Sequence, residues 1–141
     1  MVNDDLYYSG AAWEYVKPDG SPGLNDYTSL AHPWGAAPTY VLPEYLLGVA
    51  PTTPGYGSFV VRPAIGYLGL DKVEGRVPTP LGAIKVSWKV SGSEAKVSVE
   101  VPGGAKGEMK VPKGWTVAGG ESADDVLELS SGHTQVVLHA L

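Results

Sequence analysis

The second half of the chain alternates hydrophobic and polar residues. Residues 83–90 place three polar side chains on one side and four apolar ones on the other, as a half-buried strand requires. Residues 95–101 repeat this alternation after a polar turn at 91–94. The pattern predicts a β-hairpin over residues 83–101.

Shorter segments of strand composition flank the hairpin, and turn signals rich in Gly, Pro and Ser separate them. The expected strands are residues 58–63, 72–77, 107–111, 125–129 and 133–138. About seven short strands at this spacing indicate a mainly β fold, an antiparallel β-sandwich.

The first half of the chain shows helical spacing instead. Apolar residues recur at helical intervals over residues 38–48, and Gly48 followed by Pro51 predicts the end of that helix. Pro43 lies within this span, and we expect it to kink the helix rather than end it. Residues 3–16 are expected to add one or two helical turns.

Composition also divides the chain. All eight tyrosines lie at or before Tyr67, and residues 1–70 hold two basic and six acidic residues. Residues 71–141 hold eight basic and nine acidic residues, which decorate the polar faces of the expected strands. We therefore expect a short helical and loop segment over residues 1–54 and the sandwich over residues 55–141.

Charge and composition exclude several classes of protein. The net charge of -5 and the lack of a basic cluster argue against a nucleic-acid or anionic-membrane partner. The longest apolar run falls far below the ~18 residues that a membrane span needs. The sequence holds no cysteine, which excludes disulfides and thiol catalysis. The first residues lack the basic start and apolar stretch of a signal peptide, so a chain that natively begins at Met1 is expected in the cytoplasm.

Six short motifs follow one another along nearly the whole chain. They are GAAWE at 10–14, SLAHPW at 29–34, YLLGV at 45–49, PG at 54–55, RP at 62–63 and GRVPTPLG at 75–82. In this order they resemble the C-terminal region of bacterial-type α-L-rhamnosidases, of the glycoside hydrolase family 78 type. The resemblance implies that residues 1–54 are the end of a helical (α/α)6 barrel that carries the active site, and that the family's C-terminal β-sandwich domain follows.

The resemblance also implies roles for single residues. Glu14 corresponds to the general base of an inverting hydrolysis of terminal α-L-rhamnosides, and His32 corresponds to a histidine that lines the rhamnose pocket. Trp13, Trp34 and Tyr40 are the expected substrate-binding residues, since aromatic faces stack on sugar rings. Inverting hydrolysis needs a second carboxyl group, and the family's general acid lies upstream in the barrel, where no part of this chain matches it. We therefore expect that the chain alone is not a competent glycosidase.

Each candidate also has a structural explanation. A glutamate is most often an exposed surface residue, a histidine in a loop most often caps local backbone, and aromatic side chains most often fill cores or interfaces. His133 and His139 lie near the last strand without a third ligand at metal spacing, so neither a metal nor another cofactor is expected.

Three hypotheses for the function remain open. The first is a truncated or excised C-terminal region of a rhamnosidase-like hydrolase, which predicts an exposed apolar patch on residues 6–47 and a homo-oligomer, such as a dimer, through it. The second is a stand-alone module that binds a rhamnoside or another small ligand through the tryptophans beside Glu14 and His32. The third is a small enzyme with a redirected reaction, in which Glu14 or His32 acts as acid or base.

Overall fold

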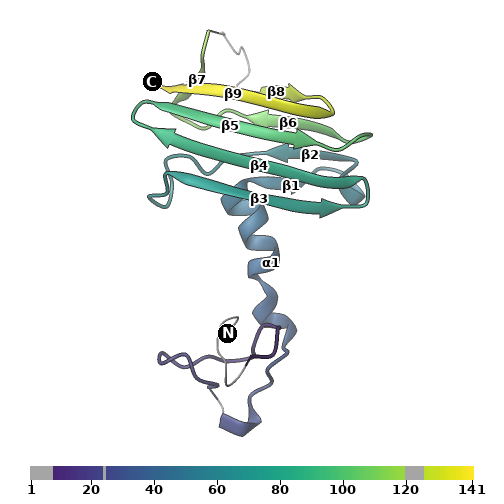
Figure 1. Ribbon diagram of the computed structural model, residues 1–141, viewed down its shortest axis with the longest axis vertical. Helices are drawn as coiled ribbons and strands as arrows, with labels where there is room; N and C mark the ends of the chain where they lie inside the picture. The colour runs from purple at the N-terminus through teal and green to yellow at the C-terminus, as the bar shows by residue number, and fades with distance from the viewer. Residues whose placement is uncertain (1–7, 24, 120–125) are drawn as a thin grey trace. The chain divides into compact units, whose positions relative to one another are not determined.

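A computed structural model shows two compact units in this chain (Figure 1). The described residues are 8–23, 25–119 and 126–141. Contacts group residues Met1–Val41 into the first unit and Leu42–Leu141 into the second. Each unit has internal contacts of its own, and the second contains all the strands described.

One layer of the second unit is a five-stranded antiparallel sheet. Its strands, in the order β3-β4-β5-β9-β7, are β3 Lys72–Thr79, β4 Gly82–Ser91, β5 Glu94–Val101, β9 Gly132–Ala140 and β7 Trp115–Val117. β4 and β5 pair from Lys85 opposite Glu100 to Ser91 opposite Glu94, which confirms the predicted hairpin. The sequence pattern does not predict β7, because three residues are too few to show an alternation.

The other layer is a four-stranded sheet. Its strands, in the order β1-β2-β6-β8, are β1 Val49–Pro51, β2 Ser58–Val61, β6 Lys106–Lys110 and β8 Val126–Leu129, and a 3-10 turn, η4 Pro54–Tyr56, joins β1 to β2. β2 and β6 run parallel, with Phe59 opposite Gly107, while the other neighbouring strands are antiparallel. Parallel neighbours need a long crossover, and here the chain passes through β3, β4 and β5 of the other sheet between them.

The two sheets enclose one hydrophobic core. The inward side chains of β4, namely Ile84, Val86 and Trp88, are at most 2% exposed, and they belong to the same cluster as Phe59 and Met109 of the four-stranded sheet. Burying one side chain of this size contributes about 1.5–3 kcal/mol to folding. The antiparallel β-sandwich predicted from the sequence is therefore confirmed, with the β2–β6 pair as its one parallel element in the described part of the chain.

A helical segment precedes the sandwich in the sequence. It consists of α1 Pro38–Val41 and a π-helical turn, η3 Leu42–Leu47. The predicted helix over 38–48 is thus present, and Pro43 lies in η3, where its missing N–H cannot make the α-helical bond. Residues 8–16 contain no helix, so the expected helical turns are wrong there, and residues 3–7 lie outside the described part. Gly10 in this stretch has a φ of 69°, which interrupts any helix.

Gly48 ends the helix and begins the sandwich. Its φ is 82°, and a Cβ at this position would overlap the carbonyl of Arg62, whose N–H donates to the Gly48 carbonyl at 2.7 Å. The preceding Leu47 is buried, and it lies so close to Gly75 that a Cβ there would be 2.8 Å from its Cδ1. These contacts attach η3 and β1 to the sandwich. Residues 42–54 therefore belong to the same unit as the strands that follow.

The first unit has little regular structure. Its elements are η1 Asn25–Tyr27, η2 Pro33–Ala36 and α1, together with an isolated bridge between Val16 and Pro22. Its buried residues include one large apolar residue, Trp13 at 3% exposed, and one polar residue, Thr28 at 9% exposed. Across the residues that the structure describes, no helix has the length and apolar character needed to cross a bilayer.

Replacing Gly48 with alanine is expected to lower the free energy of unfolding by about 3 kcal/mol or more, because backbone strain and overlap with Arg62 add together. The measurement is urea unfolding followed by tryptophan fluorescence. Gly114→Ala is the matched control, since Gly114 has nearly the same φ, 84°, with nothing within 4 Å of a Cβ. It should cost only about 1–2 kcal/mol. Equal losses in the two variants would show that the Arg62 contact is unimportant.

Candidate functional site

Two segments of the first unit lie side by side and bring the candidate residues together. The Glu14 N–H donates to the Ser29 carbonyl at 2.9 Å, and the His32 N–H donates to the Ala12 carbonyl at 2.8 Å. These backbone bonds connect residues that are 15 to 20 positions apart in the sequence. They fix the side chains of Glu14 and His32 as neighbours.

The Glu14 carboxylate faces the His32 ring. Its Oε2 lies 3.8 Å from His32 Nδ1 and accepts a hydrogen bond from the Ser29 N–H at 3.2 Å. The two side chains are 21% and 30% exposed, so both are accessible from solvent. At 3.8 Å the carboxylate and imidazole are too far apart for a hydrogen bond, and they form an ion pair only when His32 is protonated.

Trp34 completes this cluster. Its indole N–H donates to the Glu14 carbonyl at 2.9 Å, and its ring centroid lies 4.2 Å from that of His32, with 37° between the planes. The side chain is 67% exposed. Trp34 therefore holds the loop in place through its N–H and still presents aromatic surface to solvent.

The other two predicted aromatic residues lie differently. Trp13 is 3% exposed, and its indole N–H donates to Ser9 Oγ at 3.0 Å. Ser9 Oγ in turn donates to the Leu30 carbonyl at 2.5 Å. Tyr40 is 60% exposed on α1, and the described contacts of Glu14, His32 and Trp34 do not include it. The structure thus brings three of the five candidates into contact, and the catalytic and binding roles of all five stay predictions.

The cluster is supported by three further residues, none of which the sequence analysis named as a site residue. Ser9 and Ser29 make the hydrogen bonds described above. Gly35 permits close packing, because a Cβ there would lie 2.6 Å from the Trp13 carbonyl oxygen and 3.0 Å from Ala12 Cβ. Each of the three contacts a segment that is distant in the sequence, so the residues next to it in the chain do not reveal its role.

The cluster supplies one carboxylate and one imidazole. Inverting glycoside hydrolysis needs two carboxyl groups roughly 6.5–9.5 Å apart, one of them protonated. Asp19 follows Glu14 by five residues in the sequence. Its carboxylate accepts hydrogen bonds from Ser21 Oγ at 2.7 Å and from the Ser21 N–H at 2.9 Å. These bonds hold the pKa of Asp19 below its ordinary value, so they favour the ionised carboxylate, which cannot donate a proton. Among the described residues, no three His, Cys, Asp or Glu side chains gather as metal ligands.

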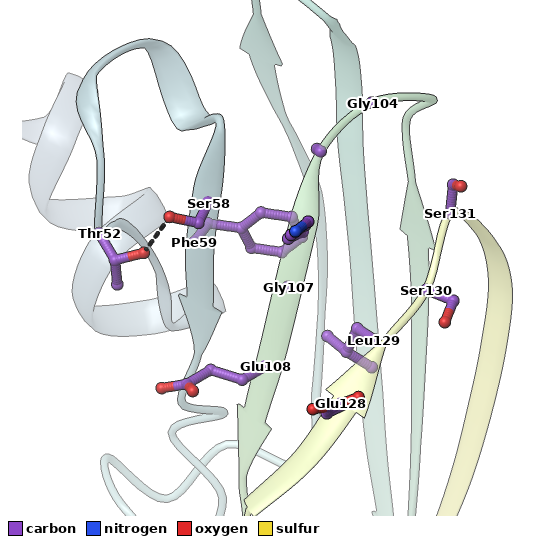
Figure 2. A pocket seen from close by; sticks show the side chains of 12 residues that line it. Thr52, Ser58, Phe59, Gly104, Gly107, Glu108, Glu128, Leu129, Ser130 and Ser131 are labelled. Atoms are coloured by element: carbon purple, nitrogen blue, oxygen red, sulfur yellow. Dashed lines mark hydrogen bonds between the residues drawn. The ribbon is translucent and has the colours of Figure 1, made fainter.

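The second unit carries a hollow of about 830 Å³ at its four-stranded sheet, shown in Figure 2. The Phe59 ring crosses Gly107, where a Cβ would lie 2.6 Å from Phe59 Cζ. Glu108 and Glu128 are directly opposite each other on β6 and β8, and Thr52 Oγ1 donates to Ser58 Oγ at 2.9 Å. The hydroxyls bond one another, and neither carboxylate forms an ion pair within the described residues.

Comparison with known proteins identifies the class of this β-sandwich. Residues 48–124 match the family model of the bacterial alpha-L-rhamnosidase C-terminal domain. A curated alpha-L-rhamnosidase from Alteromonas sp. (strain LOR) is 32% identical over 111 residues, which are 78% of this chain and 11% of that protein. The chain belongs to the bacterial α-L-rhamnosidase C-terminal domain family, as the six motifs indicated.

Solved structures share the fold. The α-L-rhamnosidase of Streptomyces avermitilis, complexed with L-rhamnose, superposes with a TM-score of 0.68 at 20% identity over 89% of this chain. The α-L-rhamnosidase of Dictyoglumus thermophilum gives 0.67 at 19% identity over 79%. This chain spans only 13% and 14% of those two proteins.

Gly35→Ala is expected to push residues 12 and 13 away from η2 and break the hydrogen bond from the Trp34 indole to Glu14, because the added methyl group meets the Trp13 carbonyl. The measurement is the NMR signal of the Trp34 indole proton, which should shift and exchange faster with solvent. Gly103→Ala is the control, since Gly103 has no positive φ and nothing lies within 4 Å of a Cβ there. An unchanged indole signal in Gly35→Ala would contradict the packing described.

Proposed function

We propose that this chain is a C-terminal piece of an α-L-rhamnosidase, in which the first unit supplies part of the rhamnoside site and the second is its accessory β-sandwich. The observation that carries the proposal is the contact of Glu14, His32 and Trp34 within one cluster. Family membership supports a relation to the hydrolysis of terminal α-L-rhamnosides. The chain covers a small part of its relatives, so the remaining part of the site comes from elsewhere.

The chemistry of the cluster fits a sugar ligand. The exposed face of Trp34 offers a surface for the apolar face of a pyranose ring, and the Glu14 carboxylate and the His32 imidazole offer hydrogen-bonding groups to its hydroxyls. The Streptomyces avermitilis relative, whose structure holds L-rhamnose, supports rhamnose as that sugar. Trp13 acts as a positioning residue in this proposal, because it precedes Glu14, is 3% exposed and donates a hydrogen bond to Ser9.

Glu14 takes the role of general base, which activates the attacking water. Its carboxylate accepts only one hydrogen bond from the backbone in the described structure, so oxygen lone pairs are left for a water molecule. A general acid must protonate the leaving oxygen from the opposite side of the sugar. Since the cluster holds one carboxylate, we assign that acid to a region outside this chain, and the chain alone binds without hydrolysing.

The surface of residues 6–47 supports association through this part of the chain. Its large apolar side chains that are at least one-third exposed are Tyr8, Tyr15, Val16, Tyr27, Trp34, Tyr40 and Val41 in the first unit and Leu42 and Tyr45 in the second. Exposed apolar side chains in such numbers favour protein contacts. We propose that they form a homo-oligomer, such as a dimer, when the chain is by itself.

The test of the sugar site is saturation-transfer NMR with L-rhamnose on the folded protein. Weak binding to the wild type is expected, with at least a tenfold loss in Glu14→Gln and His32→Ala, because each removes a group that faces the ligand. Glu128→Gln, a carboxylate of the sandwich, is the control and should leave the signal intact. No transfer to the wild type, or equal transfer to all four proteins, would overturn the proposal.

A parallel assay with 4-nitrophenyl α-L-rhamnoside tests the lack of hydrolysis. No nitrophenol release above the buffer rate is expected, since the cluster of Glu14, His32 and Trp34 supplies one carboxyl group and inverting hydrolysis needs two. Release that Glu14→Gln abolishes would show instead that the chain is a complete small enzyme.

Sedimentation velocity over a hundredfold range of concentration tests the association. A dimer is expected to form, and Tyr15→Ser with Tyr27→Ser should weaken it at least tenfold, because these rings are 57% and 90% exposed. Leu141→Ser is the control, since Leu141 is 88% exposed but lies outside residues 6–47. A monomer at every concentration would rule out the oligomer.

A further inference from the structure

The second unit has another cleft, with a volume of about 540 Å³. None of the residues that line it belongs to the Glu14 cluster. Three segments line it: η3, the loop that follows β2 and the segment that follows β6. Val111 and Ala64 form its buried apolar lining. Cavities of this size and lining hold small ligands in other proteins.

Two tyrosines from different segments line this cleft. Tyr45 of η3 is 64% exposed, and Tyr67 of the loop after β2 is 59% exposed. Neither side chain makes a hydrogen bond within the described part of the chain, so both rings and both hydroxyls are available to a ligand. Tyrosine offers an apolar ring face and a polar tip, which is the combination that a sugar ring requires.

The charges around the cleft are mostly positive. Arg62, Lys110 and Lys113 line it together with one acidic residue, Glu44, on a chain whose net charge is -5. None of these four side chains forms an ion pair among the residues described. The paired lysines are instead on the five-stranded sheet, namely Lys72, Lys85 and Lys96. The cleft therefore keeps an uncompensated positive charge that favours an anionic ligand.

The loop that carries Tyr67 has an unusual backbone. Ile65 is 1% exposed and anchors the loop in the core, while Leu68 adopts a φ of 61° between two glycines, Gly66 and Gly69, that also have positive φ. A left-handed conformation disfavours a leucine, and such strain in proteins is concentrated at functional positions. Here the conformation accompanies the exposure of Tyr67 and Leu68 at the cleft.

We propose that this cleft binds an anionic sugar residue, a uronate, with Tyr45 and Tyr67 against the ring and Arg62, Lys110 and Lys113 around the carboxylate. The choice of a saccharide rests on the proposed function, and the choice of a carboxylate rests on the charges. The cleft shares no residue with the Glu14 cluster. Its ligand in this proposal is a charged unit of a polysaccharide that also carries rhamnose.

The test is an NMR titration of the ¹⁵N-labelled chain with methyl β-D-glucuronide and with methyl β-D-glucoside, which differ only in the carboxylate. The glucuronide is expected to shift amides of the cleft and to bind at least tenfold more tightly than the glucoside. Raising the salt should weaken it, since the attraction is screened. Tyr67→Ala and Lys113→Gln should each weaken binding at least fivefold, while Lys106→Gln, an unpaired lysine outside the cleft, should have no effect.

Four results would overturn the proposal: no shifts, equal binding of glucoside and glucuronide, the same cleft shifts with sodium acetate, or concentration-dependent cleft shifts without sugar that Tyr67→Ala removes. The last would identify a second copy of the chain as the occupant. Glu14→Gln should leave glucuronide binding unchanged. A wild-type chain that binds the glucuronide but not L-rhamnose would therefore count against the proposed function and not against this site.

Discussion

The second unit depends on the close approach of two backbone segments at Gly48. The helix ends there, β1 begins there, and the Arg62 carbonyl occupies the space that any side chain would need. The same joint aligns β1 with β2 and places Leu47 over Gly75 of the opposite sheet. One residue without a Cβ thus connects the helical segment, both sheets and the core.

The two units gain their order from different interactions. The second has a core that joins both sheets and includes 21 buried residues among those described, so hydrophobic burial dominates its stability. In the described part of the first unit, Trp13 and Thr28 are buried, and backbone hydrogen bonds between residues 12–14 and 29–32 hold its loops together. Its exposed tyrosines are consistent with the proposal that this unit belongs against further protein. The candidate reactive groups therefore lie on the part of the chain with the least core of its own.

The two proposed sites use different chemistry. The cluster of the first unit pairs one carboxylate with one imidazole beside an exposed tryptophan, an arrangement suited to a neutral sugar and a water molecule. The cleft of the second unit combines tyrosine rings with cations that have no internal partner. Taken together, the two proposals imply a polymer with neutral and charged sugar units.

The sequence by itself determined the features that depend on near neighbours. The hairpin over 83–101 follows from a period of two, and the helix end follows from Gly48, whose φ only glycine adopts easily. The sequence also carried the family resemblance through its ordered motifs.

The tertiary structure decided what depends on contacts between distant residues. β1 and β7 are too short to show a pattern and exist because neighbouring strands offer hydrogen bonds, and the parallel β2–β6 pair depends on where three intervening strands lie. The sequence predicts a substrate-binding role for both Trp13 and Trp34, yet one is buried and the other exposed. Likewise, Glu14 meets His32 only because backbone bonds across 15 to 20 residues bring their segments together, and no local propensity encodes such a pairing.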